Sequence, residues 1–184
     1  GTLRYGIAMR DGFFYTVDGD SKKVMEFNSY GDLLSLFYAD DSSTHKILEE
    51  SGHLSESTCH PISFPFNYLG LITVDSKKTV YTACEIPANR QEQNEDGNLL
   101  YSQVVLRFAR DGSYADYLGQ QGPGGTPFPF IKNLYMTEKD ELVVVCSSND
   151  GFLVFWFAAD GFLKYKIPVG TKSAPTVEPA DSAS

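Results

Sequence analysis

The side chains best suited to bind a metal ion lie together in one polar stretch of the chain. Three histidines, His45, His53 and His60, fall within 16 residues, and Cys59 precedes the last of them. Imidazole nitrogens and thiolates are the ligands that zinc prefers in proteins. The spacing matches no known zinc finger, however, and the neighbours Cys59 and His60 cannot easily turn toward one ion. We therefore expect a polar connection, keep the three histidines as the metal candidates, and expect no cofactor.

Other patterns of reactive residues give no catalytic site. Asp18, Gly19 and Asp20 lack the further carboxylates of a calcium loop. The chain contains no glycine-rich loop that leads from a strand into a helix, and no G-x-S-x-G nucleophile turn. Cys84 and Cys146 lie in apolar segments, so we expect them to be buried free thiols. No residue is assigned to catalysis.

Composition narrows the classes of protein and of partner. The 184 residues include 24 acidic and 15 basic side chains, which give a formal net charge of −9. That charge repels phosphate backbones, so we expect no nucleic-acid partner. Hydrophobic residues make up 42% and aromatic residues 14% of the chain, which is enough for a core and favours strands. No apolar run reaches the roughly 18 residues that a membrane span needs.

The elements that must position these residues come from an internal repeat. Three segments each contain an apolar strand that ends in phenylalanine, three residues, and then a glycine that permits a tight turn. The three phenylalanines are Phe27, Phe108 and Phe157, and we expect them to be buried at equivalent sites. Upstream of each, residues 13–18, 79–84 and 141–146 also align.

Each repeat is therefore predicted to form a four-stranded antiparallel meander. Repeats of roughly 40–50 residues with four strands are typical of β-propeller blades. We expect an all-β fold with three blades, at about residues 3–38, 67–118 and 128–168. Residues 171–184 are rich in Pro, Ala, Ser and Thr, which predicts a flexible linker or disordered tail.

The repeat resembles the NHL family of six-bladed β-propellers. The resemblance rests on Ile7–Met9, on Asp11–Asp18, and on the strand that ends at Phe27 and is followed by Tyr30–Leu33. Cys84 and Cys146 stand where the family pattern usually has aspartate. The stretch from Gly124 to Phe130 also resembles NHL-type proteins of the bacterial envelope, lipoproteins among them. The resemblance implies a cell-envelope or periplasmic location.

The number of blades sets up an expectation about assembly. NHL-type rings close with about six blades, whereas this chain has three. We expect that the chain is part of a larger ring, and the alternative is that two copies complete one. Three blades alone would leave an apolar face of each terminal blade in water, and such faces favour association. We therefore expect either further blades or a second copy to cover them.

The long connections indicate which side of the blades carries function. Residues 39–66, 86–100 and 119–130 are all expected on one face of the ring, where binding residues usually lie. Aromatic and proline residues in these stretches suit a protein or peptide partner. The predicted binding residues are Phe66, Tyr68, Phe130 and Arg90. The sequence thus favours a non-enzymatic scaffold, and the alternative is a propeller hydrolase or lyase with a metal in its central channel.

Overall fold

The fold is all-β. The computed structural model describes residues 5–41, 57–91, 93, 95–97, 99, 102–119, 128–170 and 178–179. These residues form strands and one short 3₁₀ helix, η1 (Ala88–Arg90), without any α-helix. In this part of the chain no helix has both the length and the apolar character to cross a membrane.

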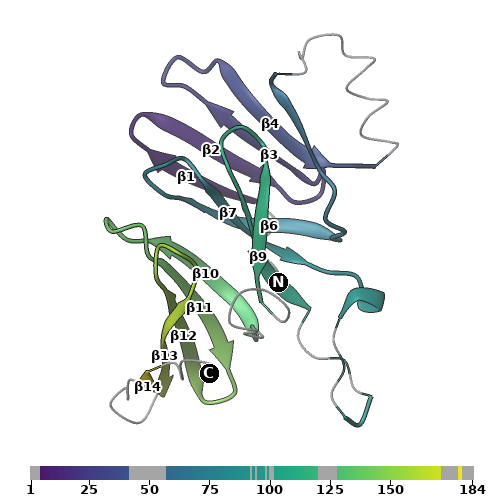
Figure 1. Ribbon diagram of the computed structural model, residues 1–184, viewed down its shortest axis with the longest axis vertical. Helices are drawn as coiled ribbons and strands as arrows, with labels where there is room; N and C mark the ends of the chain where they lie inside the picture. Colours follow the sequence, from purple (N-terminus) through teal and green to yellow (C-terminus); the bar gives the residue numbers. More distant parts are fainter. Residues whose placement is uncertain are drawn as a thin grey trace.

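The strands form three separate sheets, which follow one another in chain order (Figure 1). The first contains β1 (Tyr5–Arg10), β2 (Phe13–Asp18), β3 (Lys23–Phe27), β4 (Leu33–Ala39) and β5 (Cys59–Ile62). The second contains β6 (Tyr68–Val74), β7 (Val80–Glu85), β8 (Gln103–Phe108) and β9 (Tyr114–Leu118). The third contains β10 (Phe130–Met136), β11 (Leu142–Ser148), β12 (Gly151–Phe157), β13 (Leu163–Gly170) and β14 (Glu178–Pro179). The predicted all-β fold of three antiparallel, blade-like sheets is confirmed.

Within each sheet, strands that are neighbours in sequence are neighbours in space. Four consecutive strands form an antiparallel meander, and short turns join them except between β7 and β8, which are separated by residues 86–102. Two strands depart from the predicted pattern. β5 pairs in parallel with β4, although residues 39–66 were expected to be a connection only. Glu178–Pro179, in the predicted flexible tail, pairs with Tyr165 and Lys166 of β13.

The second sheet lies between the other two and is covered on both faces. On one side its residues Leu69, Val104 and Phe108 pack against Tyr15 and Val17 of the first sheet. On the other side a second core joins it to the third sheet; the buried members include Tyr81, Val105, Leu118, Val144, Phe155 and Phe157. β1 and β10 both lie against β6, so the first strands of the three sheets are adjacent. This arrangement makes the three sheets successive members of one stack.

A network of polar bonds joins the turns at one edge of this stack. The Lys78 ammonium lies 2.6 Å from a carboxylate oxygen of Asp11, which belongs to the first sheet. The backbone N–H of Ser76 donates to Asp140 of the third sheet at 2.8 Å. Arg10 lies 3.6 Å from the same Asp140 carboxylate. The turns between the first and second strands of all three sheets are therefore tied together.

One of the three aligned phenylalanines differs from the prediction. Phe108 and Phe157 are buried in the two cores, whereas Phe27 is only half-buried. Phe108 and Phe157 each face the sheet that precedes theirs in the chain. In the described residues no sheet precedes the first one, so nothing of that kind covers Phe27. The expectation that all three are equally buried is therefore wrong for Phe27.

Candidate functional site

The long connections leave the sheets at the edge opposite the turn network. β7 ends at Glu85 there, and β8 and β10 begin there. Gln103, the first residue of β8, forms a bridge with Phe128 just before β10. The side-chain oxygen of Gln103 also accepts a hydrogen bond of 2.6 Å from the backbone N–H of Ile131. The ends of connections 86–100 and 119–130 therefore meet at one edge, as predicted.

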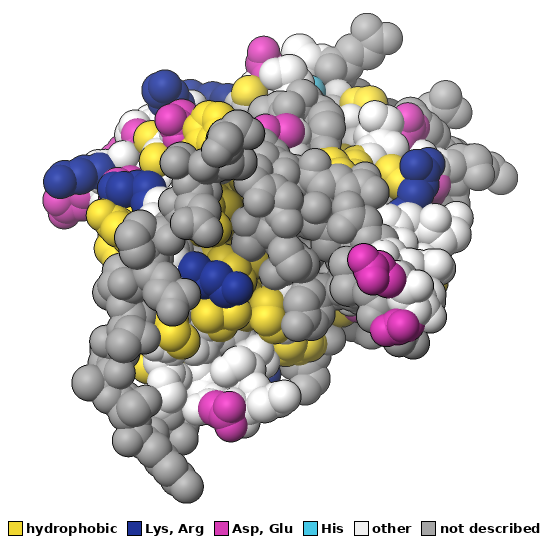
Figure 2. All heavy atoms as spheres, turned by 60° about the horizontal axis from the view of Figure 1, so that its bottom comes forward, with side chains coloured by type: hydrophobic (Ala, Val, Ile, Leu, Met, Phe, Trp, Pro, Cys, Tyr) yellow, Lys and Arg dark blue, Asp and Glu magenta, His cyan; other side chains and the backbone are white. Residues whose placement is uncertain are grey.

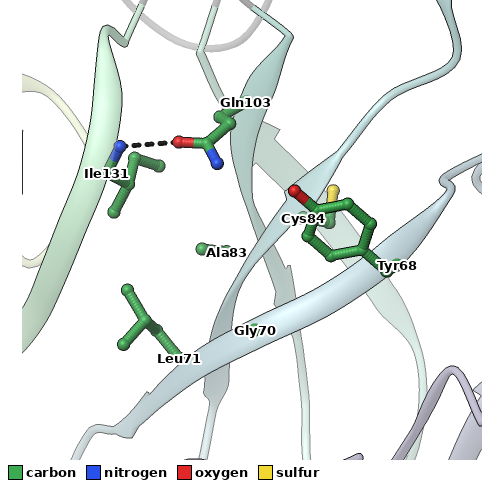
Figure 3. Close-up of a pocket in the computed structure, with 7 residues that line it drawn as sticks. All are labelled: Tyr68, Gly70, Leu71, Ala83, Cys84, Gln103 and Ile131. Atoms are coloured by element: carbon green, nitrogen blue, oxygen red, sulfur yellow. Dashed lines mark hydrogen bonds between the residues drawn. The ribbon is translucent and has the colours of Figure 1, made fainter. Parts of the chain in front are cut away.

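A small cavity lies at this edge between the second and third sheets (Figure 3). Its lining residues are Tyr68, Gly70, Leu71, Ala83, Cys84, Gln103 and Ile131. Its volume of about 10 Å³ is enough for one water-sized group. Because Gln103 holds the Ile131 N–H through its oxygen, its amide nitrogen turns toward the space between Ile131 and Tyr68 (Figure 3). The cavity thus contains one oriented hydrogen-bond donor.

The wall of the cavity is shaped by β-bulges in the two first strands. The register of β6 against β7 shifts between Gly70 and Ile72, and Leu71 takes a positive φ of 53°. β10 has a comparable shift between Ile131 and Asn133. The bulge at Leu71 directs its carbonyl oxygen to the Thr82 hydroxyl, which donates at 2.9 Å. Bulges and strained backbone are common beside functional sites, since they re-aim neighbouring groups.

The ionisable groups of the cavity are held in hydrogen bonds or buried. The Tyr68 hydroxyl donates to a carboxylate oxygen of Glu85 at 2.7 Å. Burial raises the pKa of the Cys84 thiol far above its usual range, with a smaller contribution from the negative charge of Glu85. Cys84 is therefore a neutral thiol at physiological pH and a poor nucleophile. This chemistry suits recognition by hydrogen bonding more than covalent catalysis.

The four predicted binding residues do not form one group. Tyr68 lines the cavity. Phe66 is buried in the core between the first and second sheets, where its ring packs among apolar side chains. Arg90 ends helix η1 and is exposed, but it does not line the cavity. Phe130 begins β10, is 37% exposed, and has the Lys132 ammonium 4.4 Å from its ring centroid.

One face of the molecule is mixed in character. Figure 2 shows hydrophobic side chains grouped on part of the face that comes forward when the bottom of Figure 1 is turned toward the viewer. A basic side chain lies beside them, and other acidic and basic side chains lie elsewhere on the same face. A surface of this kind can contact both apolar and charged parts of a partner.

The histidines are not brought together in the described residues. His45 and His53 lie outside them. His60 is part of β5, and its ring lies 5.2 Å from that of Phe37 and against the turn at Gly112. Burial lowers the pKa of His60. Across the ranges that the structure describes, no three His, Cys, Asp or Glu side chains are grouped as metal ligands.

Sequence reasoning missed Gln103, the residue that carries the hydrogen-bonding chemistry of the cavity. Its role depends on Ile131, which lies 28 residues further along the chain. The available signal was its place as the first residue of an apolar strand, next to a long connection. A polar side chain at the end of a strand, where two sheets meet, can form hydrogen bonds at the edge that the sheets share.

The comparisons with known proteins give structural likeness only at a distance. No protein-family model matches the chain. No curated protein matches it either. Among solved structures, one described as a streptogramin B lyase structure aligns with 97% of this chain and 69% of its own, at 9% identity and a TM-score of 0.41. A likeness at this level carries no conclusion about activity.

Proposed function

We propose that this chain is a non-enzymatic propeller-type scaffold, related to the NHL class, that binds an extended peptide segment of a protein partner at the long-connection edge. The observation that carries the proposal is the side chain of Gln103. It is 7% exposed, its oxygen is fixed by Ile131, and its nitrogen faces a cavity for one small group. A carbonyl oxygen of a bound peptide would accept from this nitrogen, as backbone carbonyls do throughout folded proteins.

Aromatic side chains near the cavity supply contact area. Tyr68 lines the cavity and is held in place by Glu85, so little side-chain entropy is lost when a partner packs on its ring. Phe130 and Lys132 offer an exposed ring with a cation above it. Tyrosine is among the residues most enriched in interface hot spots, and phenylalanine is enriched at interfaces in general. For the location of the protein we propose the cell envelope, on the resemblance alone.

A matched pair of substitutions tests this proposal. Gln103→Glu keeps an oxygen that accepts from Ile131 and removes the amide donor. Gln93→Glu makes the same change at an exposed position that does not line the cavity. Peptides selected from a random display library on the immobilised chain are then measured by fluorescence anisotropy against the parent chain and both variants, after thermal melting has shown that each variant is folded.

We expect Gln103→Glu to weaken the selected peptides about tenfold, equivalent to about 1.4 kcal/mol, because one buried hydrogen bond is lost. Gln93→Glu should bind them like the parent chain. The proposal fails if the selected peptides bind the folded Gln103→Glu chain as tightly as the parent. It also fails if the library yields no peptide that binds the parent chain.

A further inference from the structure

Over β1 to β3, the first sheet has one apolar face that no described sheet covers; on the same side of β4, Leu36 and Tyr38 are buried. We call the face of the second and third sheets that contacts the preceding sheet the leading face, and the opposite face the trailing face. In the first sheet, the trailing face contacts the second sheet and the leading face is the opposite one. The register of β1 to β3 places alternate residues of these strands on the leading face of the first sheet. The large apolar ones are Tyr5, Ile7, Met9, Phe14, Met25 and Phe27.

The same positions are covered in the other sheets. Ile7 pairs with Thr16, and the equivalent residue Ile72 pairs with Thr82. Ile7 is 65% exposed, whereas Ile72, on the leading face of the second sheet, is 7% exposed. In the third sheet the corresponding Leu134 is 5% exposed. The difference arises because the second and third leading faces each contact the trailing face of another sheet.

The third sheet has the complementary uncovered surface. Its trailing face is formed by alternate residues of β10 to β13. Six of its large apolar residues are Tyr135, Val143, Phe152, Val154, Trp156 and Tyr165. Tyr135 is 53% and Phe152 46% exposed, and the other four are exposed or half-buried. The chain therefore ends on one side in a leading face and on the other in a trailing face.

Charge at the long-connection edge supports the same pairing. Asp18 ends β2 at that edge of the leading face of the first sheet, opposite Lys23 of β3 on the same face. The exposed Lys132 lies near the start of β10, at the corresponding edge of the third sheet. Opposite charges at the margin of two apolar faces favour their approach in one orientation.

We infer that these two faces bind each other between copies of this chain, so that two copies pair head to tail and close a ring of six sheets. Each contact would repeat the leading-to-trailing packing that already exists twice within the chain. Because the two faces differ, one contact leaves two faces open, and a second contact between the same two copies closes the pair. This inference concerns faces other than the proposed peptide site and does not depend on it.

Sedimentation of the full chain and of three variants tests the inference. Ile7→Asp alters only the leading face, and Phe152→Asp alters only the trailing face. Tyr30→Asp is the matched control, since Tyr30 is 90% exposed on a turn outside both faces. We expect the parent chain and Tyr30→Asp to sediment at tens of micromolar as particles of twice the 20.4 kDa chain mass.

Mixing the variants distinguishes head-to-tail pairing from other modes. Ile7→Asp alone and Phe152→Asp alone should each be monomeric. An equimolar mixture should form a heterodimer, because it still contains one intact leading face and one intact trailing face that can meet. The single tryptophan, Trp156, lies on the trailing face, so its emission should shift to shorter wavelength as the parent chain associates.

Several results would overturn the inference. One is a parent chain that stays monomeric over the whole concentration range, with unchanged Trp156 emission. Another is a dimer formed by Ile7→Asp alone or by Phe152→Asp alone. A third is an equimolar mixture of the two that remains monomeric. Both results contradict contact between a leading face and a trailing face. Assemblies that grow without limit would contradict a closed pair. Loss of the dimer in Tyr30→Asp would show that neither face is responsible.

Discussion

Phe27, Phe108 and Phe157 occupy the same position in three strands and yet differ in burial. The difference lies outside their own sheets, whose local geometry is alike. Each ring lies on the same side of its sheet, and in the described residues only Phe108 and Phe157 meet a preceding sheet there. The same residue type at the same site therefore contributes differently to stability according to its neighbour.

This comparison gives a prediction for alanine substitution. Phe157→Ala should lower the free energy of unfolding by about 3–5 kcal/mol, because it removes a fully buried ring and leaves a cavity. Phe27→Ala should lower it by about 1 kcal/mol in dilute solution, since much of that ring already contacts water. Urea denaturation at low protein concentration measures both values. Equal costs would contradict the assignment of the leading faces.

At the candidate site, sequence reasoning identified an aromatic residue and missed an amide. Tyr68 could be predicted because aromatic and proline residues cluster in the connections. Gln103 could not, since its orientation comes from the backbone N–H of Ile131 in another sheet. Phe66 carries the same aromatic signal as Tyr68 but lies in a core. Residue type thus indicated that aromatic side chains lie near the long-connection edge. Only the packing of the sheets shows that Tyr68 lines the cavity there, whereas Phe66 is buried in a core.

At the scale of elements, the strand order followed from the repeat, but the irregular pairings did not. Alternating residues and tight turns predict the meander of each sheet, because both signals are local. β5 joins β4 in parallel through a connection of about twenty residues, and its sequence Cys-His-Pro-Ile has no strand-like alternation. At the bulge, the side chain of Leu71 packs against the core shared with the third sheet, a contact between residues far apart in the sequence.

The turn network gives a prediction about acid stability. Hydrogen bonds from Ser76 lower the pKa of Asp140 below the usual aspartate value of 3.8, and the positive charge of Arg10 adds to the effect. The carboxylate therefore stabilises the fold above that pH, and this contribution is lost as the pH falls through the lower folded value. Asp140→Asn should destabilise the chain near neutral pH, and the difference from the parent should shrink at pH values below 3.8.

Urea denaturation at neutral and at acidic pH measures this difference. Asp150→Asn is the control, because Asp150 is an exposed turn residue of the same sheet and, among the described residues, bonds to no neighbouring sheet. It should leave the free energy of unfolding unchanged at both pH values. If Asp140→Asn lowers the free energy of unfolding by the same amount at neutral and at acidic pH, the charge of Asp140 is not what joins the turns.

At the scale of the whole molecule, the arc of three sheets predicts a melting temperature that depends on concentration. If two copies bury four faces on pairing, mass action stabilises the folded chain as its concentration rises. Each tenfold increase should raise the Tm by about 2 °C for a chain of this size. Differential scanning calorimetry of the parent and of Ile7→Asp tests this, since the variant should melt at a constant temperature.

The short strands β5 and β14 have a consequence for how copies of this chain can meet. Unpaired strand edges are templates for adding further strands and so for aggregation. In the first and third sheets the last strand of the meander is paired instead with a strand of four or two residues. Each of these contains a proline, Pro61 or Pro179, which has no N–H to donate. The rims of these two sheets are thus poor templates for edge-to-edge growth, and contact through their broad faces is favoured over fibre formation.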